Sequence, residues 1–207
     1  MDSYNRRSVA EYRQGDDSVM RIAIDFDSTL FPTVEKVIEI YNERNNTKLN
    51  VSQITAYNLY DCFSEDVADE LISLFVDKTI YNSLQPYKGS VKAVQSLVNK
   101  GHEIVIATAT DVRNLEWKEK LLQRYFPFIP KENLIRIHNK KLLNVDVLVE
   151  DKLDSLTQTF AERICFNQPW NYDRHIDYAY SIYRINNWGE INNIIQSIER
   201  KEKEWEK

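Results

Sequence analysis

The sequence predicts an α/β protein built on a doubly wound, mostly parallel sheet. Three apolar runs, at residues 20–26, 103–107 and 145–149, each end on polar side chains, as strands buried on both faces of a parallel sheet typically do. Amphipathic helical patterns separate these runs, and this alternation favours a doubly wound sheet. A further run at residues 163–166 and weaker candidates at 134–137 and 183–185 would complete the sheet.

Three helical patterns lie between or after these runs, and local signals mark where they end. Residues 90–100 repeat apolar side chains every three or four positions and stop at Gly101, because glycine accepts the left-handed conformation that follows a helix. Residues 112–125 stop before Pro127, which cannot continue a helix. Residues 188–201 form the last pattern and run into a charged end.

The stretch between the first two strands has a different character. It contains no comparable strand, and it carries two amphipathic helical patterns, the second with Ser64 as its expected N-cap. An insertion of about fifty residues is too long for an ordinary connection, so we expect it to have a role of its own. The predicted organisation is a flexible N-terminal tail at 1–19, an α/β core at 20–30 and 86–200, a small helical cap at 31–85, and a charged C-terminal end at 201–207.

Composition excludes several classes of protein. A chain of 207 residues with 43% hydrophobic and 12% aromatic residues can bury a core without disulfides or a structural metal. A net charge of −5 argues against a binder of duplex nucleic acid, although a small phosphorylated ligand remains compatible with it. The sequence has no apolar run of about 18 residues, which argues against a membrane protein. Two widely spaced cysteines, Cys62 and Cys165, fit reduced thiols in a cytoplasmic protein.

The polar residues that follow the strands are the candidate functional residues. Ligands of open parallel sheets bind at the carboxyl ends of the strands, and there the sequence places Asp25, Asp27, Thr108, Glu150 and Asp151. Four carboxylates at close quarters repel one another, and Mg²⁺, which prefers oxygen ligands, would relieve this repulsion. With a nearby lysine, the cation would also neutralise a phosphate group.

The spacing of the first two carboxylates suggests phosphoryl transfer. One carboxylate can attack phosphorus directly, and a second, two residues on, can protonate the leaving oxygen and then activate water. Asp25 and Asp27 form such a pair. A lone D-x-D-x-T motif is more often a turn or a helix cap than a catalytic site. Here the motif follows a buried strand, and this position favours a catalytic site.

Three motifs then carry a family resemblance. DFDSTL at 25–30, VIATAT at 105–110 and VLVEDK at 147–152 resemble the haloacid dehalogenase-like (HAD) phosphohydrolases, which have a Rossmann-like core. The helical insertion after the first motif, together with residues 84–94, 117–126 and 166–171, is similar to the 5′(3′)-deoxyribonucleotidase branch of that superfamily.

The resemblance assigns roles to individual residues. It implies that Asp25 is the nucleophile and a metal ligand, that Asp27 is the general acid/base with its backbone carbonyl on the metal, and that Thr108 binds phosphate. Asp151 would be the third carboxylate on Mg²⁺, with Glu150 beside it or bridged to it by water.

The phosphate-binding lysine of the family has two candidates here. Lys140 fits best and Lys118 fits the other known placement, and each has a solvated surface lysine as its alternative. The chain departs from the branch at Glu150, where an aspartate is usual, and at Ala109, where a hydroxyl residue can stand. Ala109 would bind phosphate through its backbone N–H alone.

The cap supplies the candidates for the substrate pocket. The cap aromatics Tyr57, Tyr60, Phe63 and Tyr81 either stack on a nucleobase or form the small core of the cap. Lys152 either reaches the substrate or faces water, and Trp170 and Trp188 are interpreted as packing residues.

These observations lead to one functional hypothesis and two alternatives. The leading hypothesis is a Mg²⁺-dependent phosphomonoesterase, a 5′-nucleotidase that acts on (deoxy)ribonucleoside monophosphates through an aspartyl-phosphate. One alternative is a HAD phosphatase for another small ester such as a sugar phosphate. The other is a catalytically impaired HAD-like binding scaffold. A homodimer is compatible with the resemblance.

Overall fold

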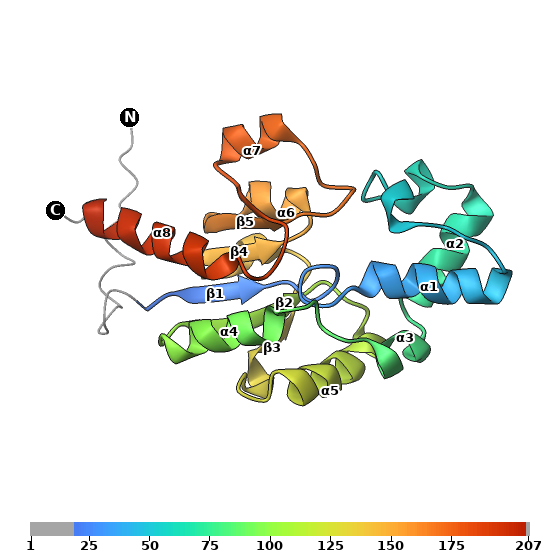
Figure 1. The fold of residues 1–207 in the computed structure, drawn as a ribbon, viewed down its shortest axis with the longest axis horizontal. Coiled ribbons are helices and arrows are strands. Elements are labelled where there is room, and N and C mark those ends of the chain that lie inside the picture. The colour runs from blue at the N-terminus through green and yellow to red at the C-terminus, as the bar shows by residue number, and fades with distance from the viewer. Residues whose placement is uncertain (1–18, 206–207) are drawn as a thin grey trace.

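A six-stranded, wholly parallel sheet forms the centre of the computed structural model, which describes residues 19–205 (Figure 1). The strand order is β3-β2-β1-β4-β5-β6. All six runs predicted from the sequence form strands: β1 Arg21–Ile24, β2 Glu103–Thr108, β3 Leu134–Arg136, β4 Val147–Glu150, β5 Glu162–Phe166 and β6 Tyr183–Ile185. The doubly wound α/β prediction is therefore confirmed. Most of the predicted tail at 1–19 lies outside the described residues.

The central strand β1 determines how the site is assembled. It pairs with β2 on one side and β4 on the other, so that Ile24 lies opposite Ile106 and Val149. The carboxyl ends of these three strands therefore finish side by side. The polar residues that follow them are brought to one edge of the sheet, as expected for a parallel sheet.

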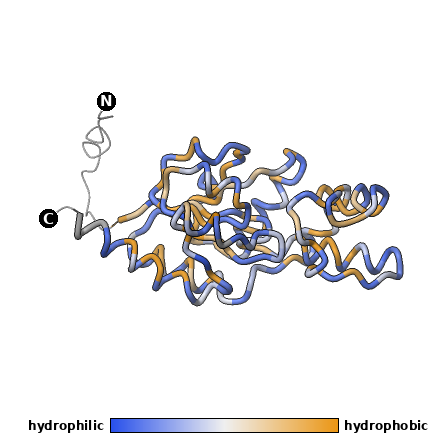
Figure 2. The backbone as a smooth tube through the Cα atoms, turned by 90° about the horizontal axis from the view of Figure 1, so that it is seen from above, coloured by the Kyte–Doolittle hydropathy of each residue, from blue (hydrophilic) through white to orange (hydrophobic). Residues whose placement is uncertain are grey.

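Alternate strand residues point to opposite faces, and both faces are covered. Ile22 and Ile24 belong to the larger hydrophobic cluster, which includes side chains of α4 and α8. Ala23 belongs to the second cluster, which includes Leu156 of α6. Figure 2 shows segments of hydrophobic residues gathered at the centre of the molecule, where the strands lie. Burial on both faces explains why the strands are continuously apolar.

The helices of the core follow the predicted patterns with small shifts. They are α4 Ser90–Asn99, α5 Leu115–Tyr125, α6 Leu153–Gln158, α7 Arg174–Tyr180 and α8 Ile191–Trp205. Gly101 has a φ of 94°, as its predicted place after α4 requires. Helix α8 begins three residues later than predicted, because Trp188 is buried in the preceding turn, where its Nε1 donates to the Thr29 carbonyl at 3.0 Å. The sequence patterns do not predict α6 or α7.

The chain between β1 and α4 contains three helices, α1 Thr33–Asn45, α2 Glu65–Leu74 and α3 Lys78–Ser83. They lie beyond the carboxyl ends of the strands, and α1 contacts both α2 and α3 (Figure 1). Ser64 occupies the N-cap position of α2, although its side chain makes no capping hydrogen bond. The division into a core and a cap at 31–85 stays a prediction, and these helices are called the cap below.

Among residues 19–205, none of the helices combines the length and the apolar content that crossing a bilayer would require.

Candidate active site

Three buried carboxylates meet where β1 and β4 end. Asp25, Glu150 and Asp151 each offer an oxygen, and these oxygens all lie within 4.8 Å of one another. The pairing of β1 with β4 brings them together, because the Asp25 amide continues the ladder by donating to the Val149 carbonyl at 2.9 Å. The predicted convergence of these strand ends is therefore present in the structure.

Lys140 offsets part of this negative charge. Its ammonium is buried and donates to both Asp25 Oδ1 and Glu150 Oε2. The other oxygen of Glu150 accepts the backbone N–H groups of Asp151 and Lys152, each at 3.1 Å. Both oxygens of Glu150 are thus occupied by the protein, which fits the accessory position beside Asp151 that the resemblance implied.

Burial and crowding change the acidity of these groups. Burial, and next the charge of Glu150, raises the pKa of Asp25 to about 7. Burial also raises the pKa of Asp151 well above its usual range, with Glu150 and Asp25 adding to the effect. Burial alone would lower the pKa of Lys140, but Asp25 and Glu150 raise it above its ordinary value. The site therefore holds more negative charge than its lysine compensates.

A hard divalent cation fits this donor set. Asp25, Glu150 and Asp151 supply oxygen atoms only, and one lysine offsets one of their three charges. Carboxylate oxygens are the ligands that Mg²⁺ prefers in proteins, and its double charge would complete the compensation. Asp25 and Asp151 are the residues best placed to hold it, because the oxygens of Glu150 are already engaged.

A second ion pair lies beside the first. Lys118 of α5 is completely buried, and its Nζ donates to Asp27 Oδ2 and, at 2.9 Å, to Thr108 Oγ1. The other oxygen of Asp27 accepts from Thr33 Oγ1 at 2.9 Å, and the Asp27 side chain remains 30% exposed. Asp27 is therefore held on both oxygens and still reaches the cavity.

Both lysine candidates belong to the site. The sequence left a solvated surface position open for Lys140 and for Lys118, and the structure buries both of them. Each ammonium is held by one of the two aspartates of the D-x-D motif. Thr108 is the last residue of β2, Ala109 follows it directly, and Ala109 is exposed to the cavity.

The loop that carries these aspartates has an unusual backbone. Ser28 has a φ of 56°, a left-handed conformation that costs about 1–2 kcal/mol for a residue with a Cβ. Its N–H donates to the Phe31 carbonyl at 2.7 Å, and its own carbonyl accepts from Gln168 Nε2 at 2.6 Å. These two bonds hold the turn that places Asp25 and Asp27 on the same side.

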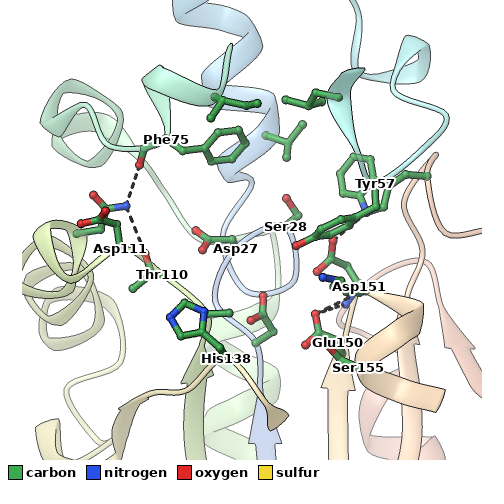
Figure 3. Close-up of a pocket in the computed structure, with 18 of the residues that line it drawn as sticks. Asp27, Ser28, Tyr57, Phe75, Thr110, Asp111, His138, Glu150, Asp151 and Ser155 are labelled. Carbon is green, nitrogen blue, oxygen red and sulfur yellow. Dashed lines mark hydrogen bonds between the residues drawn. The ribbon is translucent and has the colours of Figure 1, made fainter. Parts of the chain in front are cut away.

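A cavity of about 550 Å³ separates the carboxylates from the cap. In Figure 3, Tyr57 and Phe75 lie on the cap side, Asp27 and Ser28 at the centre, and His138 and Glu150 toward the strands. The cap contributes mainly apolar side chains to the lining: Val34, Ile54, Leu59, Ile72, Phe75 and Val76. One wall of the cavity is therefore charged and the opposite wall is hydrophobic.

The structure separates the predicted pocket residues from one another. Tyr57 and Lys152 line the cavity, and the Lys152 ammonium lies 4.3 Å from the centre of the Tyr57 ring. Tyr60 lies outside the lining, where its hydroxyl donates to Asp69 at 2.5 Å on the exposed side of α2. Phe63 also lies outside it and packs against the hydrophobic core. Of the four cap aromatics named from the sequence, Tyr57 and Tyr81 line the cavity.

Several side chains of the site were not identified from the sequence. Thr33 holds Asp27, and Asn114 donates to the Phe75 carbonyl of the cap at 2.8 Å. His138 lines the cavity, and Trp170, interpreted from the sequence as a packing residue, also lines it. For Thr33 a signal exists, because it follows Asp27 by six residues at a helix start. No pattern in the sequence connects Asn114 or Trp170 with the site.

Comparisons with known proteins agree with this geometry. A family model described as 5′ nucleotidase, deoxy (pyrimidine), cytosolic type C protein matches residues 18–202. The 5′(3′)-deoxyribonucleotidase of Bacillus subtilis (strain 168) is 27% identical over 173 residues, which cover 82% of this chain and 95% of that protein. The 5′(3′)-deoxyribonucleotidase of Clostridium acetobutylicum is 24% identical over 180 residues, which cover 86% of this chain and 95% of that protein.

Solved structures show the same fold. A HAD family hydrolase from Deinococcus radiodurans R1, crystallised with bound phosphate and sodium, matches with a TM-score of 0.61 at 12% sequence identity. The match covers 88% of this chain and 97% of that one. The structure of a protein described as a predicted phosphatase from Clostridium acetobutylicum matches with a TM-score of 0.57 at 14% identity, covering 86% of this chain and 99% of that one.

Proposed function

Because the chain belongs to the family of cytosolic type C 5′ nucleotidases, deoxy (pyrimidine), we propose that it is a Mg²⁺-dependent phosphatase of nucleoside monophosphates that works through an aspartyl-phosphate. Family membership makes the chain a phosphoric monoester hydrolase with a HAD-like fold. It also argues against the alternative of a non-catalytic scaffold. The metal, the intermediate and the substrate are the parts that we propose.

The observation that carries the proposal is the pairing of each aspartate of the D-x-D motif with its own buried lysine under an apolar cap wall. Lys140 holds Asp25, and Lys118 holds Asp27 and Thr108. Lys140 lines the cavity beside Asp25, and Lys118, buried outside the lining, holds Asp27 and Thr108, so the two ammonium groups converge on the D-x-D motif. Such convergence of positive charge is the main requirement of phosphoryl transfer.

The proposed reaction has two steps. A carboxylate oxygen of Asp25 attacks phosphorus, the bond between phosphorus and the ester oxygen breaks, and Asp27 gives its proton to that oxygen. In the second step Asp27 accepts a proton from a water molecule, whose oxygen attacks phosphorus and releases inorganic phosphate. Asp25 is thereby restored as a carboxylate and Asp27 as an acid.

The remaining residues bind and orient. Lys118, Lys140, Thr108 and the Ala109 N–H would hold the phosphate oxygens. Asp25, the Asp27 carbonyl and Asp151 would hold Mg²⁺, which when bound supplies positive charge to the phosphate. The helices of the cap would exclude bulk water from the aspartyl-phosphate.

The apolar wall supports a nucleotide over a sugar phosphate as the substrate. A sugar phosphate presents hydroxyl groups on every side, and these would lose hydrogen bonds with water against Val34, Ile72 and Phe75. A nucleobase presents a flat, weakly hydrated face, and stacking on an aromatic ring contributes about 1–3 kcal/mol per base. Tyr57 supplies such a ring at the edge of the cavity.

A substrate panel tests the proposal. Phosphate release is measured from ribo- and deoxyribonucleoside monophosphates and from sugar phosphates, with Mg²⁺ or with EDTA. We expect Mg²⁺-dependent turnover on nucleotides, and its loss in Asp25→Asn. Full activity of Asp25→Asn would disprove the proposed nucleophile. Turnover of sugar phosphates alone would keep the mechanism and reject the nucleotide pocket.

A matched pair of variants tests the pocket. Tyr57→Ala removes the ring that lines the cavity, and Tyr60→Ala removes an exposed ring outside it. We expect the first to raise KM for nucleotides about 5–140-fold, the range that a loss of about 1–3 kcal/mol of stacking gives, and the second to leave KM unchanged. Equal effects would mean that Tyr57 does not bind the base.

The homodimer stays a prediction, which light scattering of the purified protein tests.

A further inference from the structure

Trp170 lies in the turn after β5 and meets the carboxylate cluster from the side of the cavity. Its Nε1 donates to Asp151 Oδ2 at 2.9 Å. The ring also lines the cavity, so the indole contacts both the solvent-filled space and the buried carboxylate. Packing alone would not require the N–H of the ring to point at a charged oxygen.

The Asp151 carboxylate is otherwise weakly held. Its Oδ1 accepts from Thr29 Oγ1 at 3.4 Å, which is long for a hydroxyl donor. The Trp170 bond has the length of a good hydrogen bond and ends on a charged acceptor, the stronger kind. The hydrogen bond from Trp170 therefore fixes the plane of the Asp151 carboxylate, while the longer bond from Thr29 only limits the rotation of that carboxylate.

The turn that carries Trp170 is itself rigidly attached. Asn171 Nδ2 donates to the carbonyl of Asp151 at 2.7 Å and to the carbonyl of Phe166 at 2.9 Å. Arg184 of β6 donates to the Asn171 carbonyl at 2.6 Å and to Asn171 Oδ1 at 3.1 Å. Because Asn171 bonds the backbone of Asp151, the indole and the carboxylate keep a constant relative position.

We propose that Trp170 is a positioning residue for the Asp151 carboxylate: its indole N–H holds Oδ2 and so presents Oδ1 to the divalent cation. The inference rests on the proposed function, which places Mg²⁺ between Asp25 and Asp151. Without the N–H, the carboxylate can rotate about its own axis and must be reordered when the cation binds. Loss of such an outer hydrogen bond typically costs 10–100-fold in metal affinity.

Calorimetric titration of the full-length protein with Mg²⁺ tests this role, in the absence of any substrate. Trp170→Phe keeps an aromatic ring and removes the N–H. We expect it to weaken Mg²⁺ binding 10–100-fold, and an unchanged affinity would overturn the proposal. Trp117→Phe is the matched control, because Trp117 of α5 packs on Tyr81 of α3, with 5.4 Å between ring centres, and within residues 19–205 its indole makes no hydrogen bond to Asp25, Glu150 or Asp151. We expect this variant to bind Mg²⁺ as tightly as the unaltered protein.

Asp151→Asn separates failure of the inference from failure of the proposed function. If the unaltered protein binds Mg²⁺ and Asp151→Asn does not, the proposed metal site stands, and the Trp170→Phe result alone decides the role of Trp170. If Asp151→Asn binds Mg²⁺ as tightly as the unaltered protein, the metal site is wrong and the inference falls with it.

A second measurement tests the position of Trp170 in the unaltered protein itself. Tb³⁺ bound beside an indole emits when the indole is excited, and Mg²⁺ should displace it. We expect this emission in the unaltered protein and in Trp117→Phe. Trp170→His, which offers a ring N–H in place of the indole, should lose the emission but retain tighter Mg²⁺ binding than Trp170→Phe. Absence of sensitised emission in the unaltered protein, with Tb³⁺ shown to be bound by competition with Mg²⁺, would contradict the position of Trp170.

Discussion

Replacing Lys140 by methionine should expose how strongly the carboxylate cluster opposes folding. The substitution keeps the length of the side chain and removes its charge, leaving Asp25 and Glu150 buried without their shared partner. Removing one member of a buried ion pair costs about 3–5 kcal/mol, because the remaining charge is left uncompensated. Domains of this kind are stable by about 5–15 kcal/mol, so the variant should be folded but close to its limit.

The cost should depend on pH in a definite direction. The pKa of Asp25 is raised to about 7 in the folded protein, so the metal-free protein takes up a proton on folding between about pH 4 and pH 7, and its stability falls as the pH rises through that window. Lys140 is one of the groups that lower this pKa, so its removal raises the pKa further. The difference between the two proteins should be largest above pH 7 and smaller at pH 5, where Asp25 is protonated.

Urea unfolding in EDTA at pH 8 and at pH 5 measures both quantities. Lys141→Met is the matched control, since Lys141 is the exposed neighbour in the same helical turn, and surface substitutions usually change stability by less than about 0.5 kcal/mol. A loss below about 1 kcal/mol for Lys140→Met at pH 8, or an equal loss at both pH values, would refute the reasoning.

Three further predictions concern other parts of the molecule. The Nδ1 of buried His102 accepts from the Met20 N–H at 3.2 Å, and burial lowers the pKa of His102. The free energy of unfolding should therefore fall as the pH drops below about 6.5, by at most about 1.4 kcal/mol per pH unit. Urea unfolding of His102→Gln should not show this part of the pH dependence. Ser28→Gly should raise the melting temperature, because it relieves about 1–2 kcal/mol of strain from the left-handed backbone. The greater conformational entropy that glycine loses on folding costs less, about 0.5–1 kcal/mol. Ser28→Ala keeps a Cβ and should not raise the melting temperature. Thr33→Val should lower kcat about tenfold with little change in KM, and Thr33→Ser should restore it; equal kcat values would show that the bond to Asp27 has no catalytic role.

The sequence predicted the sheet well, because a strand that is buried on both faces consists of a continuous run of apolar residues. All six strands were located, even the short Tyr183–Ile185. The helices α3, α6 and α7 were not, because each spans only six or seven residues and so shows less than two turns of periodicity. Helix ends were also displaced where tertiary contacts decide them, as Trp188 does before α8.

The candidate site was predictable where its residues follow a strand directly. Asp25, Asp27, Thr108 and Asp151 are placed by strand pairing alone, so their positions in the sequence suffice. Lys118 and Lys140 come from helical segments whose orientation depends on packing, and the sequence could offer both only as candidates. Side chains that act through a carboxylate, such as Thr33 and Trp170, have no spacing that identifies them, because their partners lie elsewhere in the chain. Tyr57 and Tyr60 are three residues apart, and only the fold of the cap distinguishes them.

The hydrogen bond from Thr33 to Asp27 has a mechanical consequence. Thr33 is the first residue of α1, the helix that leads out of the sheet into the cap, while Asp27 stands on the rigid loop after β1. An outward displacement of the start of α1 would lengthen or break this bond. The carboxylate that handles the proton in the proposed reaction would then keep Lys118 as its partner and lose Thr33. A single hydroxyl therefore ties the position of the first turn of the cap to the position of the Asp27 carboxylate.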